Sequence, residues 1–250
     1  VLEKLAPFAA GVVALDPRPV EALRSGGKIA EVLKGVLPAK RALAQILADQ
    51  SLPERKLLTV LLQIARAVAY AHASGVIHRD LKPANVILKQ DLTPMLMDFG
   101  LAKADASLPD LTQTSELIGT PQFMAPEQVE GRRTEIDART DVYALGGMLY
   151  QILTGQLPHR GTTAAKLFTQ IVNEDPIAPG KIRRTVAEDL EVICLKAMAK
   201  ERERRYPTAA EFAQDLERFL SGEPIEARPP SWPYRLKKHL AKRRMAVGMT

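Results

Sequence analysis

The sequence predicts a mainly helical α+β domain. Apolar residues recur at helical spacing over much of the chain, and only a few short apolar runs are typical of strands. The chain has 250 residues, of which 46% are hydrophobic, and this suffices for a sizeable core. The single cysteine, Cys194, excludes a disulfide framework and a cysteine-built zinc site. Because Cys194 has apolar neighbours, we expect a buried, inert thiol.

The N-terminal half begins with weakly patterned residues. A short strand is expected at 11–15, and a helix is expected over 28–50 with a break at Pro38. Ser51 is predicted to cap the next helix, which runs to about Ala73, because proline and glutamate follow it at the spacing of a helix start. Two apolar runs then predict a hairpin, and a polar loop follows; these segments span 86–88, 95–97 and 100–121.

The C-terminal half is predicted to consist of helices. The first of them is apolar on all sides, which indicates a buried central position, and it ends at Gly155. The expected helices span 140–153, about 163–173, 186–199 and 207–220. The longest apolar run is too short to span a membrane, and the four histidines form no metal-binding cluster in the sequence.

The net charge of +6 is concentrated at the C-terminal end. Seven basic and no acidic residues occur in 227–250, so residues 1–226 carry a net charge of −1, which is +6 minus 7. A nearly neutral body disfavours nucleic-acid binding by the domain. In the tail only Trp232 and Tyr234 are aromatic, which disfavours single-strand binding there.

The residues that carry chemistry lie between the long helix and the hairpin, where residues 78–85 read HRDLKPAN. Thirteen residues after Asn85, the second hairpin strand ends at Asp98. A hairpin is expected to bring these two side chains together, and amide and carboxylate oxygens are ligands that Mg²⁺ prefers. Asp80 is then available to accept a proton from a hydroxyl, and Lys82 to neutralise a transferring phosphoryl group.

These residues and several later motifs resemble the eukaryotic-type protein kinase family. The Asp98-Phe99-Gly100 motif is similar to its magnesium loop. Residues 119–121 (GTP) and 125–127 (APE) are similar to the end of its activation segment, and 140–143 (TDVY) to the start of its central buried helix. Arg205 is similar to a late arginine of the family. The form of the catalytic loop, with Lys82 two residues after Asp80, resembles the Ser/Thr kinases. Residues 118–128 (IGTPQFMAPEQ) and 189–200 (DLEVICLKAMAK) resemble bacterial Ser/Thr kinases, especially multidomain kinases of the planctomycete type.

The resemblance covers about residues 51–222 and implies a fold and an activity. The fold is a mainly α (α+β) kinase C-lobe, with a small β-hairpin and only a remnant of the N-lobe. The implied domains are an N-lobe remnant with the hinge over 1–27, the C-lobe over 28–222 and a basic juxtamembrane-like tail over 223–250. The activity is phosphoryl transfer from ATP, with Mg²⁺, to Ser and Thr of protein substrates.

The resemblance also implies roles for individual residues. The catalytic group consists of Asp80 as base, Lys82 as phosphate contact and Thr120, which braces them. The ATP and metal group consists of Lys82, Ile87 beneath adenine, and the magnesium ligands Asn85 and Asp98. The regulatory group pairs Arg79 with phosphate on the activation segment at Thr112 or Thr114. The structural group consists of His78, Phe99, Glu127, Asp141 and Arg205.

Some of these residues have simpler interpretations that the sequence leaves open. His78 is expected to be a core histidine rather than an acid or base. Asp141 near a helix start has the alternative role of a plain N-cap. Glu127 and Arg205 are expected to form a mutual buried ion pair rather than to contact substrate.

The sequence departs from the family on the N-terminal side. It contains no G-x-G-x-x-G, and neither Lys4 nor Lys28 lies in the family's Ala-x-Lys strand context; Glu3 is a poor stand-in for the partner glutamate. Two hypotheses therefore stand: a Ser/Thr kinase that is impaired in this form, and a non-catalytic kinase-like binding or scaffold module.

The tail carries a separate expectation. Aromatic residues, a basic cluster and an apolar start follow one another over 227–250, which is the order found just inside a membrane span. We expect a cytoplasmic kinase domain whose parent is anchored to the inner membrane, with the tail against anionic lipid. A solvated basic helix is the alternative. The sequence gives no indication of the oligomeric state.

Overall fold

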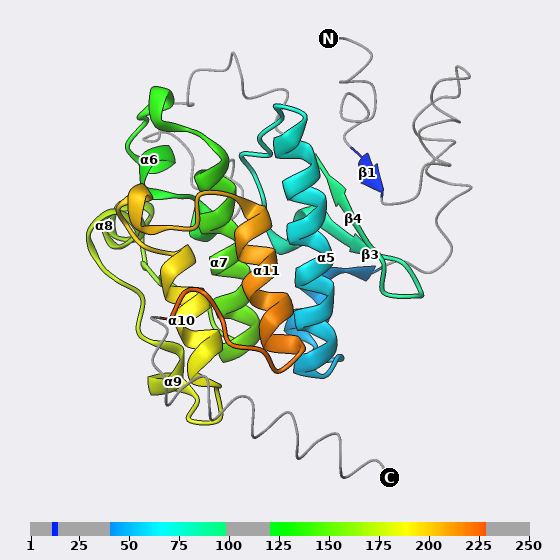
Figure 1. The fold of residues 1–250 in the computed structure, drawn as a ribbon. Coiled ribbons are helices and arrows are strands. Elements are labelled where there is room, and N and C mark those ends of the chain that lie inside the picture. Colours follow the sequence, from blue (N-terminus) through cyan, green and yellow to red (C-terminus); the bar gives the residue numbers. More distant parts are fainter. Residues whose placement is uncertain (1–11, 15–40, 99–120, 229–250) are drawn as a thin grey trace, which may run out of the picture.

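The computed structural model describes residues 12–14, 41–98 and 121–228, and these residues form a helical body with a small sheet at one side (Figure 1). Its strands are β1 (Val12–Ala14), β2 (Arg41–Ala42), β3 (Val86–Leu88) and β4 (Pro94–Met97). Its α-helices are α4 (Leu43–Ala48), α5 (Glu54–Ala73), α6 (Pro126–Val129), α7 (Ala138–Thr154), α8 (Ala164–Asn173), α9 (Pro179–Ile182), α10 (Glu188–Ala197) and α11 (Ala209–Leu220). Its 3-10 turns are η1 (Pro83–Asn85), η3 (Pro121–Phe123), η4 (Arg133–Glu135) and η5 (Arg202–Arg204).

Helix α7 lies at the centre of the helical body, with α5, α10 and α11 packed around it (Figure 1). Its apolar residues are buried on all sides, from Val142 to Leu153, as the uniformly apolar sequence predicts. At Gly146 a Cβ atom would lie 2.7 Å from the side chain of Met198, so a larger residue would push α10 away from α7. Helix α7 ends at Thr154 and is capped by Gly155, whose φ of 68° gives the left-handed conformation that glycine allows.

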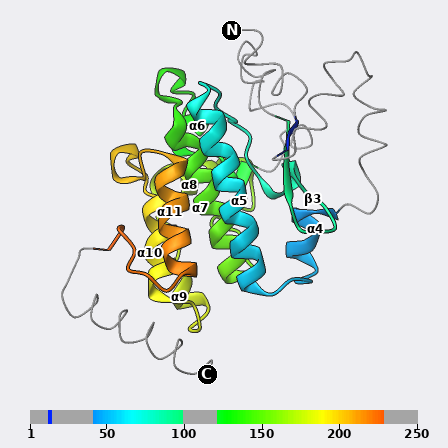
Figure 2. The same ribbon diagram turned by 45° about the vertical axis from the view of Figure 1, so that its right-hand side comes forward.

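The sheet is antiparallel, with the strand order β1-β4-β3-β2, and lies beside α5, which contacts β4 (Figure 2). In the central pair Val86 is opposite Leu96 and Leu88 is opposite Pro94. Val86 and Leu88 are buried against the helical body, whereas Ile87 between them is only half-buried. One face of the sheet therefore packs against the core. The end of β4 lies next to the start of β3.

The fold class and most elements are as predicted. The mainly helical body, the hairpin and the four C-terminal helices are confirmed, with helix ends within two residues of the expected positions. Cys194 is buried, its thiol lies 3.5 Å from the carbonyl of Gly146, and burial raises its pKa. Strand β4 contains the expected residues 95–97 and begins one residue earlier, at Pro94.

Two expectations for residues 41–53 are wrong. Arg41 and Ala42, which the expected helix includes, form strand β2 instead because they pair with β3, and α4 starts at Leu43. Ser51 does not cap α5. Pro53 occupies the cap position without a side-chain bond, and the Ser51 hydroxyl accepts a hydrogen bond from Arg41 at 3.2 Å instead. Residues 28–40 lie outside the described residues.

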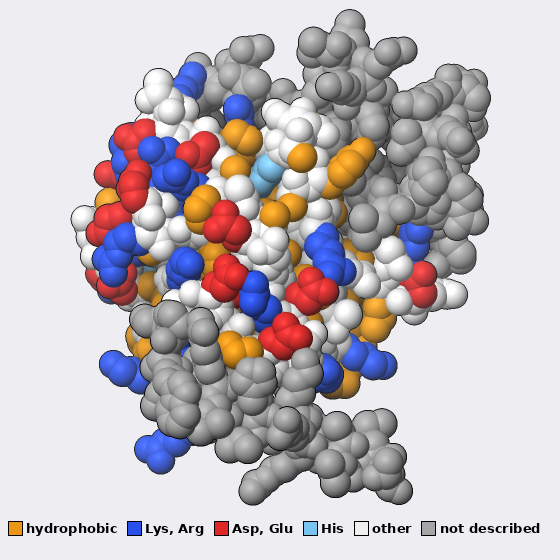
Figure 3. Space-filling view, viewed as in Figure 1, with side chains coloured by type: hydrophobic (Ala, Val, Ile, Leu, Met, Phe, Trp, Pro, Cys, Tyr) orange, Lys and Arg blue, Asp and Glu red, His pale blue; other side chains and the backbone are white. Residues whose placement is uncertain are grey.

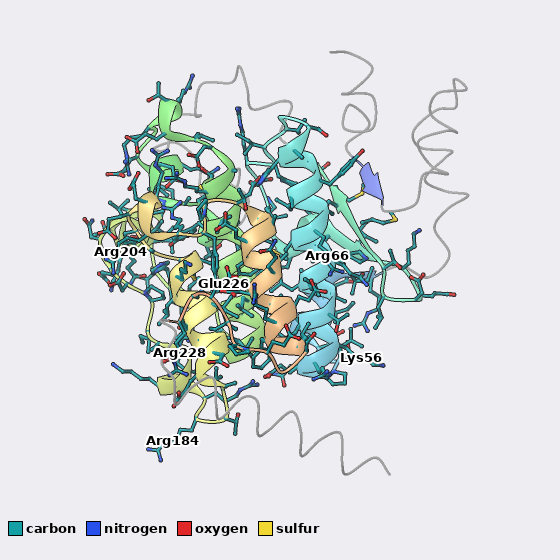
Figure 4. All side chains as sticks on the ribbon, viewed as in Figure 1. Lys56, Arg66, Arg184, Arg204, Glu226 and Arg228 are labelled. Carbon is teal, nitrogen blue, oxygen red and sulfur yellow. The ribbon has the colours of Figure 1, made fainter. Side chains whose placement is uncertain are left out.

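The start of the predicted tail packs on the helical body. The backbone amides of Glu226 and Ala227 donate to the Asp215 carboxylate at 2.6 and 2.8 Å. Arg228, near α10 in Figure 4, forms ion pairs with Glu188 and Asp189 at 2.8 and 3.2 Å. Residues 226–228 thus contact the helical body, and Arg228, which belongs to the predicted basic tail, is paired there.

The face seen in Figure 3 mixes acidic and basic side chains without a large area of one sign. This agrees with the near-neutral charge of residues 1–226. Among the described residues, no helix combines the length and the hydrophobicity that a membrane span needs.

Candidate active site

The loop of residues 76–85, here called the Asp80 loop, connects α5 to β3. Val76 and Leu81 belong to the buried core and are 6% and 2% exposed. Arg79, Asp80 and Lys82 are only partly buried. The apolar residues therefore fix the loop to the helical body, while its polar side chains stay within reach of solvent.

Asp141, in the first turn of α7, holds the backbone of this loop. Its carboxylate, which is 1% exposed, accepts hydrogen bonds from the amides of His78 at 2.8 Å and Arg79 at 2.9 Å. The cap of α7 is Asp137, whose side chain accepts from the amide of Arg139 at 2.8 Å. Asp141 is therefore not the N-cap. Its carboxylate instead accepts hydrogen bonds from two backbone amides of the loop.

The loop contains an unusual backbone conformation. Arg79 has a φ of 65°, which costs a non-glycine residue on the order of 1–3 kcal/mol. Asp98, at the end of β4, has a φ of 56°. Such conformations persist where the surroundings impose them, and here Asp141 fixes the amide of Arg79. Of the four non-glycine residues with positive φ among those described, Arg79 and Asp98 lie at the predicted site, and Gln50 and Leu92 do not.

Three predicted site residues meet around the carboxylate of Asp80. Lys82 Nζ lies 3.0 Å from Asp80 Oδ2, and Asn85 Nδ2 donates to the same oxygen at 3.1 Å. Asn85 Nδ2 also donates to the Asp80 carbonyl at 2.8 Å. The side chains of Asp80 and Lys82 are 20% and 14% exposed, so the pair is accessible at the surface. The predicted cluster of base, lysine and amide is thus brought together.

His78 connects the Asp80 loop to β4. It is completely buried, its Nε2 donates to the carbonyl of Met97 at 3.1 Å, and its Nδ1 accepts from the amide of Asp80 at 3.3 Å. Burial lowers the pKa of His78, although the charge of Asp141 opposes that shift. A neutral, buried imidazole agrees with the predicted core histidine.

The contact of His78 with Met97 brings the end of β4 to the loop, one residue before Asp98. In the register of the hairpin, Val86 lies opposite Leu96; Asn85 directly precedes Val86, and Asp98 follows Leu96 by two positions. The Asp98 side chain is exposed. The hairpin therefore places Asn85 and Asp98 at the same end of the β3–β4 pair, where the sequence predicts them.

Glu127 and Arg205 form the predicted ion pair, which is completely buried. Two parallel contacts of 2.9 Å join the guanidinium to the carboxylate, and Thr140 Oγ1 donates to Glu127 at 2.8 Å. Both side chains are 0% exposed. Burial opposes ionisation of Glu127, but the hydrogen bonds and charge of Arg205 outweigh it and lower its pKa. The pair connects α6 to the segment after α10.

The sequence that forms this site matches a known family. Residues 29–217 match the protein kinase domain. The chain belongs to the protein kinase family. The serine/threonine-protein kinase PknB of Mycobacterium leprae is 42% identical over 179 residues, which cover 72% of this chain and 28% of that protein. PknB of Mycobacterium tuberculosis is 43% identical over 174 residues, covering 69% of this chain and 28% of that protein.

A probable serine/threonine-protein kinase of Streptomyces coelicolor is 39% identical over 178 residues, covering 70% of this chain and 26% of that protein. The chain thus matches only about a quarter of the length of these bacterial kinases. The similarity supports the predicted resemblance to bacterial kinases of the Ser/Thr class.

Four of the predicted kinase residues lie outside the described residues: Phe99, Thr112, Thr114 and Thr120. Their roles remain predictions. Ile87 is half-buried on β3, on the opposite face from Val86 and Leu88, and its predicted place beneath adenine is likewise untested.

The structure adds two residues that the sequence did not suggest. His72, near the end of α5, places Nε2 2.8 Å from Asp141 Oδ2. Gln128 on α6 donates from Nε2 to the carbonyl of Arg79 at 2.7 Å. Each contact joins residues 49 or more positions apart. A pattern of local spacing contains no signal for them.

Proposed function

We propose that this kinase domain transfers the γ-phosphoryl group of ATP to serine and threonine hydroxyls of proteins, with Mg²⁺. The observation that carries the proposal is the cluster of Asp80, Lys82 and Asn85 on a loop whose backbone Asp141 fixes. The relatives of this chain that are named serine/threonine-protein kinases support the same activity.

In this proposal Asp80 orients the substrate hydroxyl and accepts its proton as the oxygen attacks phosphorus. Its carboxylate is partly exposed, so an entering hydroxyl has access to it. Lys82, 3.0 Å from this carboxylate, stabilises negative charge on the phosphoryl group in transit. Asp141 and His78 keep the loop in place, and neither needs to exchange a proton.

The donor set also fits Mg²⁺. Asn85 uses its amide nitrogen to bind Asp80, so its amide oxygen is the atom suited to a cation, and Asp98 offers a carboxylate at the same end of the β3–β4 pair. Mg²⁺ bound with ATP takes several of its ligands from phosphate oxygens, so few protein ligands are needed. Bound Mg²⁺ neutralises charge on the ATP phosphates.

The rate of phosphoryl transfer tests this function. In the longest form that the gene encodes, Asp80→Asn and Asp98→Asn should each lower kcat by about 100-fold or more, because each removes a carboxylate from the reacting groups. Labelled ATP, Mg²⁺ and a basic protein substrate provide the assay. The matched control is Asp91→Asn, at the turn between β3 and β4, where the carboxylate accepts from the amide of Thr93 at 2.9 Å. Near-normal rates in Asp80→Asn would contradict the assignment.

A second candidate is a binding module that holds nucleotide or protein without turnover. The observation that favours it is the lack of a G-x-G-x-x-G sequence in these 250 residues. We propose that residues 1–250 alone transfer phosphate slowly, because clamping of the phosphates contributes to the rate. Mg-ATP binding without Asp80-dependent labelling in the long form would favour the binding module.

Regulation and location complete the proposal. Phosphate on Thr112 or Thr114 adds about −2 charge and would pair with Arg79. Mass spectrometry of the active protein should then find phosphate on one of these two residues.

The basic residues of 235–244 would hold the domain at an anionic inner-membrane surface from the cytoplasmic side. Binding to anionic liposomes should then weaken with salt and be lost on deletion of 229–250.

A further inference from the structure

The peptide unit between Arg79 and Asp80 is held at both of its polar atoms. Its carbonyl oxygen accepts from Gln128 Nε2 at 2.7 Å, and its N–H donates to His78 Nδ1 at 3.3 Å. On the other side of Arg79, the amide donates to Asp141 at 2.9 Å. Arg79 is therefore held between α6 and α7, in the left-handed conformation that a non-glycine residue rarely adopts.

The side chain of Gln128 joins this peptide to α6. Its Oε1 accepts from the amide of Ala125 at 3.0 Å, at the start of the helix. An N–H can only donate and a carbonyl can only accept, so these two partners determine the orientation of the side-chain amide. The neighbouring Glu127 is tied to Arg205. Gln128 thus connects a firmly anchored turn to the residue before Asp80.

We propose that Gln128 is a positioning residue for Asp80, which aligns the carboxylate by holding the carbonyl of Arg79 and makes that alignment depend on the docking of α6. The inference rests on the proposed kinase function. Without the donor, the Arg79–Asp80 peptide plane loses one of its two side-chain partners and rotates more freely. Because Asp80 begins at this peptide, its carboxylate then spends less time in the arrangement with Lys82 and Asn85.

The competing interpretation is that Gln128 only caps α6. Two variants separate the interpretations. Gln128→Glu keeps an oxygen for the amide of Ala125, but an ionised carboxylate cannot donate to the carbonyl of Arg79. Gln128→Ala loses both hydrogen bonds. A capping role predicts that only Gln128→Ala differs from the wild type, whereas a positioning role predicts that both variants do.

Hydrogen exchange gives a readout that is independent of activity. The Asp80 amide should exchange about 10-fold faster in both variants, because a lost hydrogen bond of ordinary strength allows more frequent opening. Thr163→Ala is the matched control: it removes the side-chain cap of α8, where Thr163 accepts from the amide of Lys166 at 3.2 Å. It should leave exchange of Asp80 unchanged. If Gln128→Ala does not fold, Gln128→Met keeps the side-chain volume and lacks both hydrogen bonds.

The kinetics of phosphoryl transfer, measured in the longest form that the gene encodes, sharpen the test. At pH 8 both variants should lose about 10-fold to 100-fold in kcat, while KM for ATP stays within about two-fold, because the misplaced group acts in the transition state. As the pH falls toward 5, the introduced carboxyl of Gln128→Glu becomes partly protonated and can donate again. Its rate relative to wild type should therefore rise, and that of Gln128→Ala should not.

The inference is wrong if Asp80 exchange is unchanged in both variants, or if Gln128→Glu equals wild type at pH 8 in exchange and kcat. If the wild-type long form transfers no phosphate, the proposed function fails and the exchange data alone decide whether Gln128 holds the loop. Faster Asp80 exchange with unchanged kcat would also contradict a positioning role.

Discussion

The Asp80 loop and the Glu127–Arg205 pair both place charged side chains next to α7, and they differ in how those charges are accommodated. The ion pair is 0% exposed, and its guanidinium also donates to the carbonyls of Ala199, Arg139 and Lys200 at 2.7, 3.2 and 3.0 Å. In the loop the Asp80 side chain is 20% exposed, next to a residue with positive φ.

This difference separates residues that stabilise the fold from residues that are available for chemistry. A fully desolvated pair cannot lose one partner without leaving a buried charge. A partly exposed carboxylate on a strained loop contributes less to stability, since solvent screens it and the backbone conformation is unfavourable. We therefore expect substitutions in the two regions to affect stability very differently.

The largest effect is expected from the ion pair. Arg205→Leu leaves the Glu127 carboxylate buried without its partner, which should lower the free energy of unfolding by roughly 3–5 kcal/mol. Urea denaturation followed by circular dichroism measures it. A second substitution, Glu127→Leu, in the same protein should restore part of the loss by removing the uncompensated charge. A loss below about 1 kcal/mol in Arg205→Leu would show that water reaches Glu127.

A smaller effect, which depends on pH, is expected at His159, close to the ion pair. Its Nε2 lies 3.3 Å from Tyr143 Oη and 3.3 Å from Lys200 Nζ. Burial, followed by the charge of Lys200, lowers the pKa of His159 from 6.5 to about 4. The unfolded chain thus binds a proton below about pH 6.5 that the folded chain does not, and stability falls as the pH falls from 6.5 to 4.

This shift corresponds to about 3 kcal/mol at most. His159→Gln, which has no such proton to bind, should flatten the decline in stability between pH 6.5 and 4. Chemical denaturation at several pH values provides the comparison. A decline that is equally steep in wild type and variant would mean that His159 keeps an ordinary pKa in the folded protein.

The smallest effect is expected from an ion pair at the surface. Arg66, on the exposed side of α5 (Figure 4), lies 2.8 Å from Glu217 of α11, and both side chains are 51% exposed. Arg66→Ala should change the free energy of unfolding by about 0.5 kcal/mol or less, because water and salt screen the pair. The same denaturation assay applies. A loss comparable to that of Arg205→Leu would contradict the distinction by burial.

Sequence patterns predicted the parts of this site that are close together in the chain. Asp80, Lys82 and Asn85 lie within six residues, and their mutual contacts follow from the turn that connects α5 to β3. The Glu127–Arg205 pair spans 78 positions and was predicted only through the family resemblance. The helical spacing of apolar residues sufficed for α5 and α7 because most of their stability comes from packing.

Other features depend on partners that local patterns do not specify. Strand β2 forms because β3 offers ladder partners to Arg41 and Ala42, which overrides the helical pattern there. The sequence predicts that Arg228 belongs to a basic tail, whereas in the structure it forms ion pairs with Glu188 and Asp189 of α10. The contact of Gln128 with the carbonyl of Arg79 crosses 49 positions and uses a backbone atom, so it is not encoded in any pair of side-chain types.

The most direct test of the difference between the two regions is the free energy of unfolding of Asp80→Asn, measured in the same urea experiment as Glu127→Gln. Asp80→Asn is expected to be as stable as wild type to within about 1 kcal/mol, because a partly exposed carboxylate on a strained loop adds little to stability. Glu127→Gln should lose about 3 kcal/mol or more, because the guanidinium of Arg205 stays buried opposite a neutral amide. Equal losses in the two variants would contradict the separation between stabilising and reactive charges.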